Sequence, residues 1–394
     1  MRTQTTKAAR AALTAALGAA TVLAATLASA GAVTPTALAA TTGPATTGPA
    51  TTSAPTTTPA ARAAPPGGPV PPGFEVASMT FVSASEGWVL GTTKTCAHRP
   101  CTSVLRTMNG GRSWVGIPAP KFKLVSGFSS AGLLRIRFAD PLDGFAYGSQ
   151  LWATHNGGST WRHVRQLPGY IGDLEASAGV VYAVTTNNRT KKQTVYSSLA
   201  GTNSWHRVSG LPVTSGYSGL GTITLHGTAA WIILGGRLYA TQDGSSWTKE
   251  PFRCPKYLSI ASVGAYSSRQ ISLLCTGMPA LGSTTKIVYA SGNGGASFTR
   301  RGTPSRGGDG GLLAEPTPRH LFLASSSGAN FIYVSRNGGR TWRTSLFLAD
   351  GGLGWSDFGF TTATQGVAVE GYPTVGSHLR ITYNAGRTWH KVSF

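Results

Sequence analysis

The chain has 394 residues and a formal net charge of +21 at neutral pH, with 34 lysines and arginines against 13 acidic residues. A field of that sign favours anionic partners and repels cationic ones. After residue 73 no apolar run approaches the roughly 18–20 residues that a membrane-spanning helix needs, so we expect no transmembrane span in the mature chain.

The first 40 residues have the pattern of a secretory signal. A start with three positive charges precedes a stretch rich in Ala, Leu and Val, and small residues suited to cleavage occur at 28–30 and again at 37–39. This order of features is typical of Sec-type export. We predict that 1–40 is a secretory signal peptide and propeptide-like region, and that the protein is secreted or held at the cell surface.

Residues 41–73 are almost entirely Thr, Pro, Ala and Gly. Such a segment cannot bury enough apolar surface to offset the entropy lost on ordering, which predicts a disordered linker. Thr/Pro-rich stalks are sometimes O-glycosylated, and a glycosylated stalk and a plain linker both fit the composition. The signal holds three positive charges and the linker one, which leaves +17 of the +21 on residues 74–394.

Four cysteines occur, Cys96, Cys101, Cys254 and Cys275. An even number in an exported chain points to disulfides, and nearest-neighbour pairing joins Cys96 to Cys101 and Cys254 to Cys275. The chain has no C-x-x-C, and the single histidine between the first two cysteines, His98, is a weak sign of metal. We therefore predict two disulfides and neither a metal nor a cofactor.

One short motif recurs seven times between residue 108 and the end of the chain. Its copies are MNGGRSW at 108–114, HNGGSTW at 155–161, LAGTNSW at 199–205, QDGSSW at 242–247, GNGGASF at 292–298, RNGGRTW at 336–342 and YNAGRTW at 383–389. The spacing is 43 to 50 residues, and self-similarity at that period marks a stacked or circular array of small units.

Each repeat contains four short strand-like runs separated by Gly, Asp, Asn and Pro. Four strands in each of seven repeats predict an all-β fold, a single seven-bladed β-propeller of four-stranded antiparallel blades over residues 74–394. If the strands run from the centre outward, every motif forms the turn between the third and fourth strands, and all seven turns lie on one face.

The motif residues suit a tight turn, because Gly supplies positive φ and an Asn or Asp side chain accepts backbone hydrogen bonds. The closing aromatic residue begins the next strand and packs over the hairpin. We assign a structural role to Asn109, Asn156, Asp243, Asn293, Asn337 and Asn384, and to Trp114, Trp161, Trp205, Trp247, Phe298, Trp342 and Trp389.

The segments 154–161 and 335–342 resemble the Asp-box, or bacterial neuraminidase repeat (BNR), of the form [Ser/Thr]-x-[Asp/Asn]-x-Gly-x-[Ser/Thr]-Trp. The runs FVSASEGWVLG at 81–91 and FADPLDGFAYG at 138–148 add a likeness to the photosystem II assembly and stability factor propellers, among sialidase-like and WD40/YVTN/BNR-like repeat proteins. This resemblance implies the propeller fold and a role as a binding scaffold rather than an enzyme. It also implies that the repeat turns lie away from any catalytic site.

A sialidase-like or other glycoside hydrolase is the alternative, since sialidases carry Asp-boxes. The chain lacks the Phe-Arg-Ile-Pro segment of that family, and it contains no Gly-x-Ser-x-Gly elbow, P-loop or His-Glu-x-x-His. Glycosidase chemistry needs two nearby carboxyl groups. The weak candidates are Asp173 and Glu175, which lie two apart on one expected strand and so face the same side, and Glu370 in the last repeat.

Longer and more varied loops are expected on the face opposite the repeat turns, and loops on a rigid scaffold usually carry recognition. The basic residues of these loops are Lys94, Arg99, Lys121, Lys123, Arg189, Lys191, Lys192, Lys256 and Arg306. We therefore expect a monomeric, non-catalytic binding or scaffold protein whose partner is an anionic cell-wall polymer, an acidic polysaccharide or an acidic protein. No nucleic-acid-binding motif is present, so no specific nucleic-acid partner is expected.

Overall fold

The structure is a computed structural model, and it describes residues 66–93, 96, 101–125, 131–215, 221–349, 354–373 and 376–394. The predicted signal peptide and the linker up to residue 65 lie outside the described residues, and both stay predictions. Within the described ranges the chain forms 29 strands and no helix. A helix long and apolar enough to cross a membrane is therefore not found in them.

The strands form seven antiparallel sheets in chain order. The first three sheets contain β1 (Phe74–Phe81), β2 (Gly87–Thr93), β3 (Thr102–Thr107) and β4 (Val115–Ile117); β5 (Leu133–Phe138), β6 (Asp143–Gly148), β7 (Leu151–His155) and β8 (Arg162–Val164); and β9 (Tyr170–Ser177), β10 (Val180–Thr186), β11 (Lys192–Leu199), β12 (His206–Arg207) and β13 (Thr214–Ser215). The fourth and fifth contain β14 (Thr222–His226), β15 (Ala229–Leu234), β16 (Arg237–Thr241) and β17 (Thr248–Lys249); and β18 (Ser259–Ala265), β19 (Ile271–Thr276), β20 (Lys286–Ser291) and β21 (Thr299–Gly302). The last two contain β22 (Asp309–Ala314), β23 (Leu321–Ser326), β24 (Asn330–Ser335) and β25 (Arg343–Leu348); and β26 (Trp355–Phe360), β27 (Gly366–Gly371), β28 (Ser377–Thr382) and β29 (His390–Lys391).

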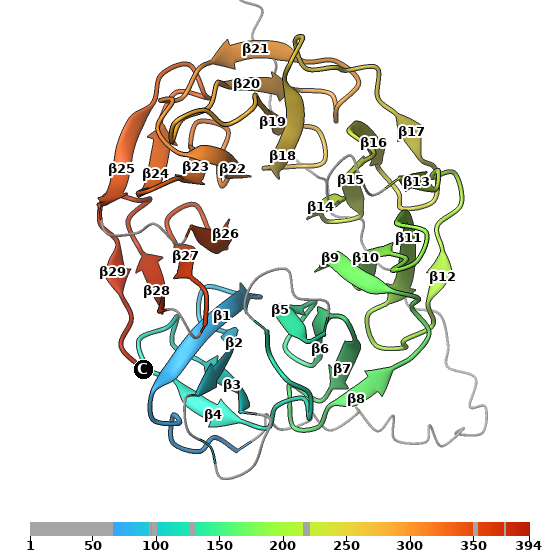
Figure 1. Cartoon of the computed structure of the whole chain (residues 1–394), viewed down its shortest axis with the longest axis vertical. Helices are drawn as coiled ribbons and strands as arrows, with labels where there is room; N and C mark the ends of the chain where they lie inside the picture. The colour runs from blue at the N-terminus through green and yellow to red at the C-terminus, as the bar shows by residue number, and fades with distance from the viewer. Residues whose placement is uncertain are drawn as a thin grey trace, which may run out of the picture. The chain divides into compact units, whose positions relative to one another are not determined.

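Figure 1 shows these sheets as blades around a central axis, with β1, β5, β9, β14, β18, β22 and β26 innermost. The predicted seven-bladed propeller is therefore confirmed. Blade 3 differs from the prediction in having a fifth strand, β13, which pairs with β11. The two-residue strand β12 covers only part of the outer edge of β11, and β13 pairs with the uncovered start of that edge.

Apolar packing between neighbouring blades holds the ring together. The described residues contain seven buried hydrophobic clusters, and each combines side chains of two adjacent blades. The second strands are the most deeply buried, and β15 is buried along its whole length. A single blade would leave both of these faces in water, so the blades depend on one another for stability.

The ring closes without a shared strand, because all strands of blade 1 come from the N-terminal side and all strands of blade 7 from the C-terminal side. Val76 and Met79 of blade 1 pack against Val367 and Val369 of blade 7. The Tyr383 hydroxyl adds a hydrogen bond of 2.8 Å to a backbone carbonyl in the first repeat turn. Side-chain packing thus closes the ring in place of a strand shared between the first and last blades.

The last part of the predicted linker belongs to the folded unit. Gly68 exchanges backbone hydrogen bonds of 2.8 and 2.9 Å with Gly116 of β4, and Val70 packs against the cluster between blades 7 and 1. The boundary at residue 73 therefore lies several residues beyond the point where packing begins. This part of the linker packs so closely on β4 that a side chain on Gly116 would collide with the carbonyl of Pro69.

The Phe-and-Gly spacing seen in the sequence joins the first two strands of a blade. Phe81 lies opposite Gly87, and Phe138 opposite Gly144, in their antiparallel ladders. In each pair the ring covers the glycine so closely that a Cβ atom would overlap it. The motif therefore reflects packing of an aromatic ring on bare backbone.

The repeat turns of blades 1, 2, 5, 6 and 7 share one hydrogen-bonding pattern, which blade 2 illustrates, whereas the turn of blade 3 has Ala200 in place of the Asn and the turn of blade 4 is one residue shorter. Asn156 Oδ1 accepts the Thr160 backbone N–H at 2.9 Å, and the Thr154 hydroxyl accepts the Gly158 N–H at 2.9 Å. The turn also donates from Gly157 N to the carbonyl of Leu142, which places it beside the turn between the first two strands. We call the face with these turns the box face, and the opposite face, with the connections between second and third strands and between blades, the loop face.

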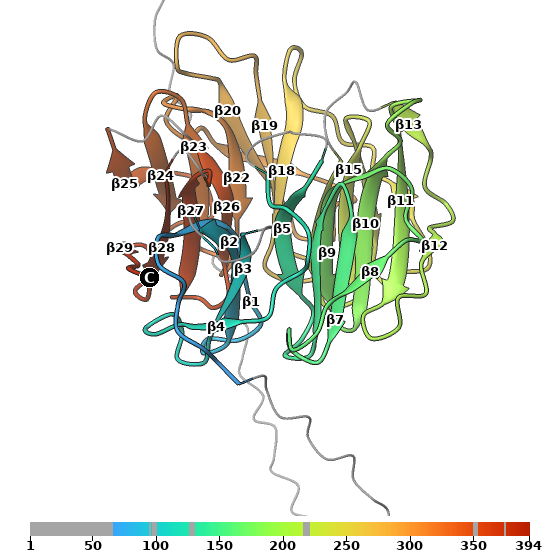
Figure 2. The same ribbon diagram turned by 60° about the horizontal axis from the view of Figure 1, so that its bottom comes forward.

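Both predicted disulfides are present. Cys96 is bonded to Cys101 within the connection from β2 to β3, and Cys254 is bonded to Cys275, joining the connection before β18 to the end of β19. All of these positions lie on the loop face. In Figure 2, where this face points upward, the connections around β18, β19 and β20 rise above the ring.

Candidate functional site

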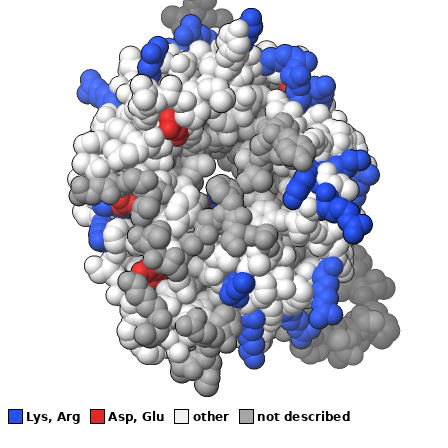
Figure 3. Space-filling view, in the orientation of Figure 1, with Lys and Arg blue, Asp and Glu red and all other residues white. Residues whose placement is uncertain are grey.

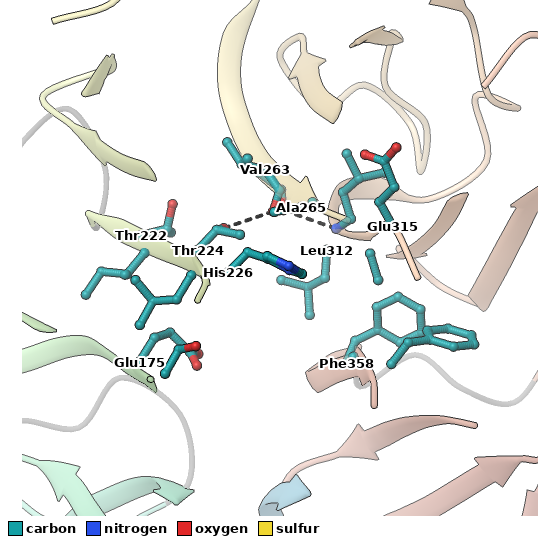
Figure 4. A pocket seen from close by; sticks show the side chains of 18 of the residues that line it. Glu175, Thr222, Thr224, His226, Val263, Ala265, Leu312, Glu315 and Phe358 are labelled. Carbon is teal, nitrogen blue, oxygen red and sulfur yellow. Dashed lines mark hydrogen bonds between the residues drawn. The ribbon is translucent and has the colours of Figure 1, made fainter. Parts of the chain in front are cut away.

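A central cavity of about 710 Å³ lies on the ring axis and is bounded by the innermost strands of all seven blades. Figure 4 shows side chains from several blades around it, among them Glu175 of β9, Glu315 after β22 and Phe358 of β26. At the end of the cavity next to the box face, Phe81 and Tyr266 lie among polar residues such as His226 and Thr361.

Arg137 of β5 is the centre of the polar network. Its Nη1 and Nη2 atoms donate to Asp357 of β26 at 2.9 and 3.1 Å, and its Nε atom donates to Glu175 at 2.7 Å. The hydroxyl of Ser78 on β1 donates to the same Asp357 carboxylate at 2.7 Å. The first three blades and the last blade thus meet at one ion cluster.

Asp173 extends the cluster toward blade 4. It accepts the backbone N–H of Ile223 on β14 at 2.8 Å, and Arg135 Nη1 lies 3.7 Å from its Oδ1 atom. Asp173 and Glu175 both line the cavity, as their spacing on one strand predicts. Glu370 does not join them, because it faces Arg380 at 2.9 Å and lies outside the cavity lining.

The protonation of these groups follows from burial and pairing. Burial alone would raise the pKa of Asp357, but Arg137 and Arg135 hold it below its ordinary value. Burial raises the pKa of Glu175 to about 7, although the charge of Arg137 acts in the opposite direction. With Glu175 protonated, two arginines face two aspartates and the cluster is neutral. This ion cluster links the blades to one another, and Glu175 is the member whose charge changes near neutral pH.

Sequence reasoning missed the two arginines and Glu315. Arg135 and Arg137 alternate with apolar residues along β5, and this alternation on an innermost strand is the signal that places both toward the axis. Glu315 follows β22 in a turn, and no motif marks it. Burial raises its pKa to about 7, with Gln270, Ser272 and Arg301 acting against that rise.

The predicted basic residues that the structure describes lie at the loop face, on connections or, for Lys192, at the start of β11, and all are exposed. They are Lys121, Lys123, Arg189, Lys191, Lys192, Lys256 and Arg306. Lys94 and Arg99 fall outside the described residues. Figure 3 shows Lys and Arg side chains around the rim, gathered most densely beside β11 and β13, whereas Asp and Glu are visible at only a few points.

The loop from 187 to 191 shows how such residues are presented. Asn187 Oδ1 accepts the backbone N–H groups of Arg189 and Thr190 at 3.0 and 2.9 Å, and the Lys191 N–H bonds to the Asn187 carbonyl at 2.8 Å. Lys191 has a positive φ of 55°. The turn therefore holds the backbone of Arg189 and Lys191 in one conformation while their side chains are exposed to solvent.

No family model matches this sequence, and no curated protein matches it. Solved structures do resemble it. YCF48 from Cyanidioschyzon merolae has a TM-score of 0.56 at 18% identity, covering 83% of this chain and 100% of that chain. A structure of YCF48 bound to D1 peptide has a TM-score of 0.55 at 16% identity, covering 80% of this chain and 95% of that one.

Oligogalacturonate lyase from Vibrio parahaemolyticus is a further neighbour, with a TM-score of 0.54 at 9% identity over 80% of this chain and 92% of that chain. At such identities the likeness shows the fold alone. It confirms the resemblance to the photosystem II assembly factor propellers at the level of architecture. Because an enzyme is among the neighbours, the fold by itself does not decide between binding and catalysis.

Proposed function

We propose that this protein is an exported, non-catalytic binding module or assembly scaffold that recognises an acidic partner at the cell surface through its loop face. The observation that carries the proposal is the set of seven exposed basic side chains on that face. None of the seven pairs with a carboxylate in the part of the chain that the structure describes. Unneutralised charges on one face attract an anionic partner and speed its association.

The backbone beneath these charges is held in place, which lowers the entropic cost of binding. The Asn187 turn fixes the segment that carries Arg189 and Lys191, and the Cys254–Cys275 disulfide fixes the connection that carries Lys256. A propeller of the same fold, YCF48, has been solved bound to D1 peptide. That precedent supports a protein or peptide as the partner, and the exposed positive charge favours an acidic one, beside an anionic cell-wall polymer or an acidic polysaccharide.

Charge reversal tests the proposal. The triple variant Arg189→Glu, Lys191→Glu, Lys192→Glu changes the net charge by six, and Arg300→Glu, Arg343→Glu, Arg387→Glu is a matched control with the same change on exposed box-face residues. Retention on an anionic cell-wall fraction and on an acidic peptide is measured at low salt. We expect the loop-face variant alone to lose retention. Equal losses in both variants would mean that overall charge, not the loop face, governs binding.

Catalysis on an acidic sugar is the second candidate, and Glu175 is the observation that favours it. A carboxyl group with a pKa near 7 that faces a cavity is suited to general acid catalysis. Incubation with fluorogenic sialosides, other glycosides and oligogalacturonate decides the matter. Turnover that disappears in Glu175→Gln supports a hydrolase or lyase, whereas the binding proposal requires no turnover.

A further inference from the structure

A second pocket, of about 410 Å³, lies on the box face between blades 5 and 6. Its walls come from the start of β19, the box turn and outer strand of blade 5, and the first turn and box turn of blade 6. Glu315 lines both this pocket and the central cavity. The pocket is distinct from the loop face, and none of the basic residues predicted from the sequence lines it.

Three arginines line the pocket from three separate segments. Arg301 is on β21, Arg319 precedes β23 and Arg340 is in the box turn of blade 6. All three are exposed, and none forms an ion pair within the described residues. Three guanidinium groups around one hollow repel one another until an anion is placed between them.

The surroundings add to this positive field. His320 follows Arg319 directly. Burial lowers its pKa, and the charges of Arg336, Arg319 and Arg387 lower it further. The arginines around the pocket therefore extend over the box face from Arg301 in blade 5 to Arg387 in blade 7. Glu315 is the one acidic residue among those that line the pocket.

The floor of the pocket is polar and buried. Glu315 is 4% exposed and Ser272 is 1% exposed. Glu315 Oε1 accepts a hydrogen bond of 2.9 Å from Gln270 Nε2. The Ser272 hydroxyl also acts on this carboxyl and lowers its pKa, but Oε2 makes no hydrogen bond of normal geometry. A buried carboxyl oxygen that is so poorly paired is costly unless it is protonated or meets a ligand. The pocket thus combines a cationic rim with a poorly satisfied carboxyl oxygen at its base.

We propose that this pocket binds an oxyanion, the carboxylate of an acidic sugar or a phosphate group, held by Arg301, Arg319 and Arg340 with the protonated Glu315 carboxyl as a donor beneath it. Guanidinium groups bind carboxylate and phosphate through paired N–H groups, which gives direction as well as charge. The proposal stands independently of the loop face and adds a second contact for an anionic partner on the opposite side of the ring.

Binding at this site depends on pH through Glu315. Its pKa near 7 means that the carboxyl donates a hydrogen bond at pH 5.5 and repels an anion at pH 8. The charged groups on the pocket side are the three arginines already named. On the other side of Glu315 the titratable and charged cavity residues are Arg135, Arg137, Asp173, Glu175, His226, Tyr266 and Asp357. A Glu315 variant is therefore needed to assign the pH dependence.

The experiment is calorimetric titration of the full chain with inorganic phosphate and, separately, with galacturonate at low salt. We expect binding of at least one probe, and a loss of about tenfold or more when Arg319→Ala or Arg340→Ala removes a charge-assisted contact. Galacturonate, whose charge is the same at both pH values, should bind more tightly at pH 5.5 than at pH 8. Arg300→Ala is the matched control, because it removes an exposed arginine next to Arg301 that does not line the pocket. Glu315→Gln keeps a donor and should make the affinity for galacturonate independent of pH.

The two probes distinguish a phosphate-bearing partner from an acidic sugar, and binding of either supports the site. The loop-face triple variant should bind both probes normally, so failure of the proposed function and failure of this site are separable. Absence of binding to both probes at pH 5.5 would overturn the proposal. So would an equal loss in Arg300→Ala, since the effect would then come from general surface charge.

Discussion

Arg137 and Asp357 are 220 positions apart in the sequence, yet the guanidinium group donates to both carboxylate oxygens at 2.9 and 3.1 Å. The two side chains are only 12% and 5% exposed. Arg137 belongs to blade 2 and Asp357 to blade 7, and Ser78 of blade 1, between them, bonds to the same carboxylate. The contact therefore joins the two ends of the chain at the inner edge of the ring, where no shared strand closes it.

Removing one member of this pair should be strongly destabilising. Arg137→Met leaves the Asp357 carboxylate buried without its cation, and breaking a buried ion pair in this way costs about 3–5 kcal/mol. Urea unfolding measures the loss, with Arg300→Met as a control for deleting an exposed arginine, for which we expect a change below about 0.5 kcal/mol. A loss for Arg137→Met no larger than for the control would show that apolar packing alone closes the ring.

Stability should fall as the pH rises through neutrality, and Glu175 contributes to this. Its pKa in the folded state is about 7, above the usual value of 4.5, so the folded protein binds the proton more tightly than the unfolded chain does. The stabilisation is therefore complete below about pH 4.5 and is lost as the pH passes 7. Glu175→Gln should flatten the unfolding free energy between pH 5 and 8. An unchanged slope in this variant would assign the dependence to other carboxyl groups with a raised pKa, such as Glu315 and Glu250.

The fold could be predicted from the sequence because its information is local and repeated. Turns built on residues such as Asn156 need Gly and a short polar side chain at fixed positions, and seven copies at regular spacing count the blades. The disulfide pairing also followed from proximity, since Cys96 and Cys101 close one short connection. The Asn156 turn and the Cys96–Cys101 disulfide are each formed by residues that are close together in the sequence.

The site could be predicted only in part, because its groups come together through ring closure. Asp173 and Glu175 share a strand, so their common side could be inferred, but their arginine partner lies on another blade. The pocket around Glu315 is built from segments of two blades whose residues follow no shared motif. Distances between such groups depend on the register and tilt of every blade between them, which no local pattern specifies.

The repeat turns should contribute stability without affecting binding. In Asn156→Ala the backbone N–H of Thr160 loses its acceptor, and the loss of such a capping contact costs about 1 kcal/mol. Thermal unfolding measures the decrease, and Asn188→Ala, on an exposed loop-face position, is the matched control. Retention on the anionic cell-wall fraction should be the same in Asn156→Ala as in the unmodified protein. A selective loss of retention would give this turn a binding role instead.

Lys286 should hold the connection between blades 5 and 6 in place. Its buried ammonium group donates to the carbonyl oxygens of Arg306, Gly307 and Gly308 at 3.0, 3.0 and 2.6 Å. Burial lowers its pKa to about 8, so the group is still charged at neutral pH. In Lys286→Met these carbonyls lose their donor, and backbone N–H groups of the connection should exchange with solvent faster in hydrogen-exchange measurements. Lys249→Met, on the exposed strand β17, should leave this exchange unchanged, and equal protection in both variants would mean that the connection is ordered by its other contacts.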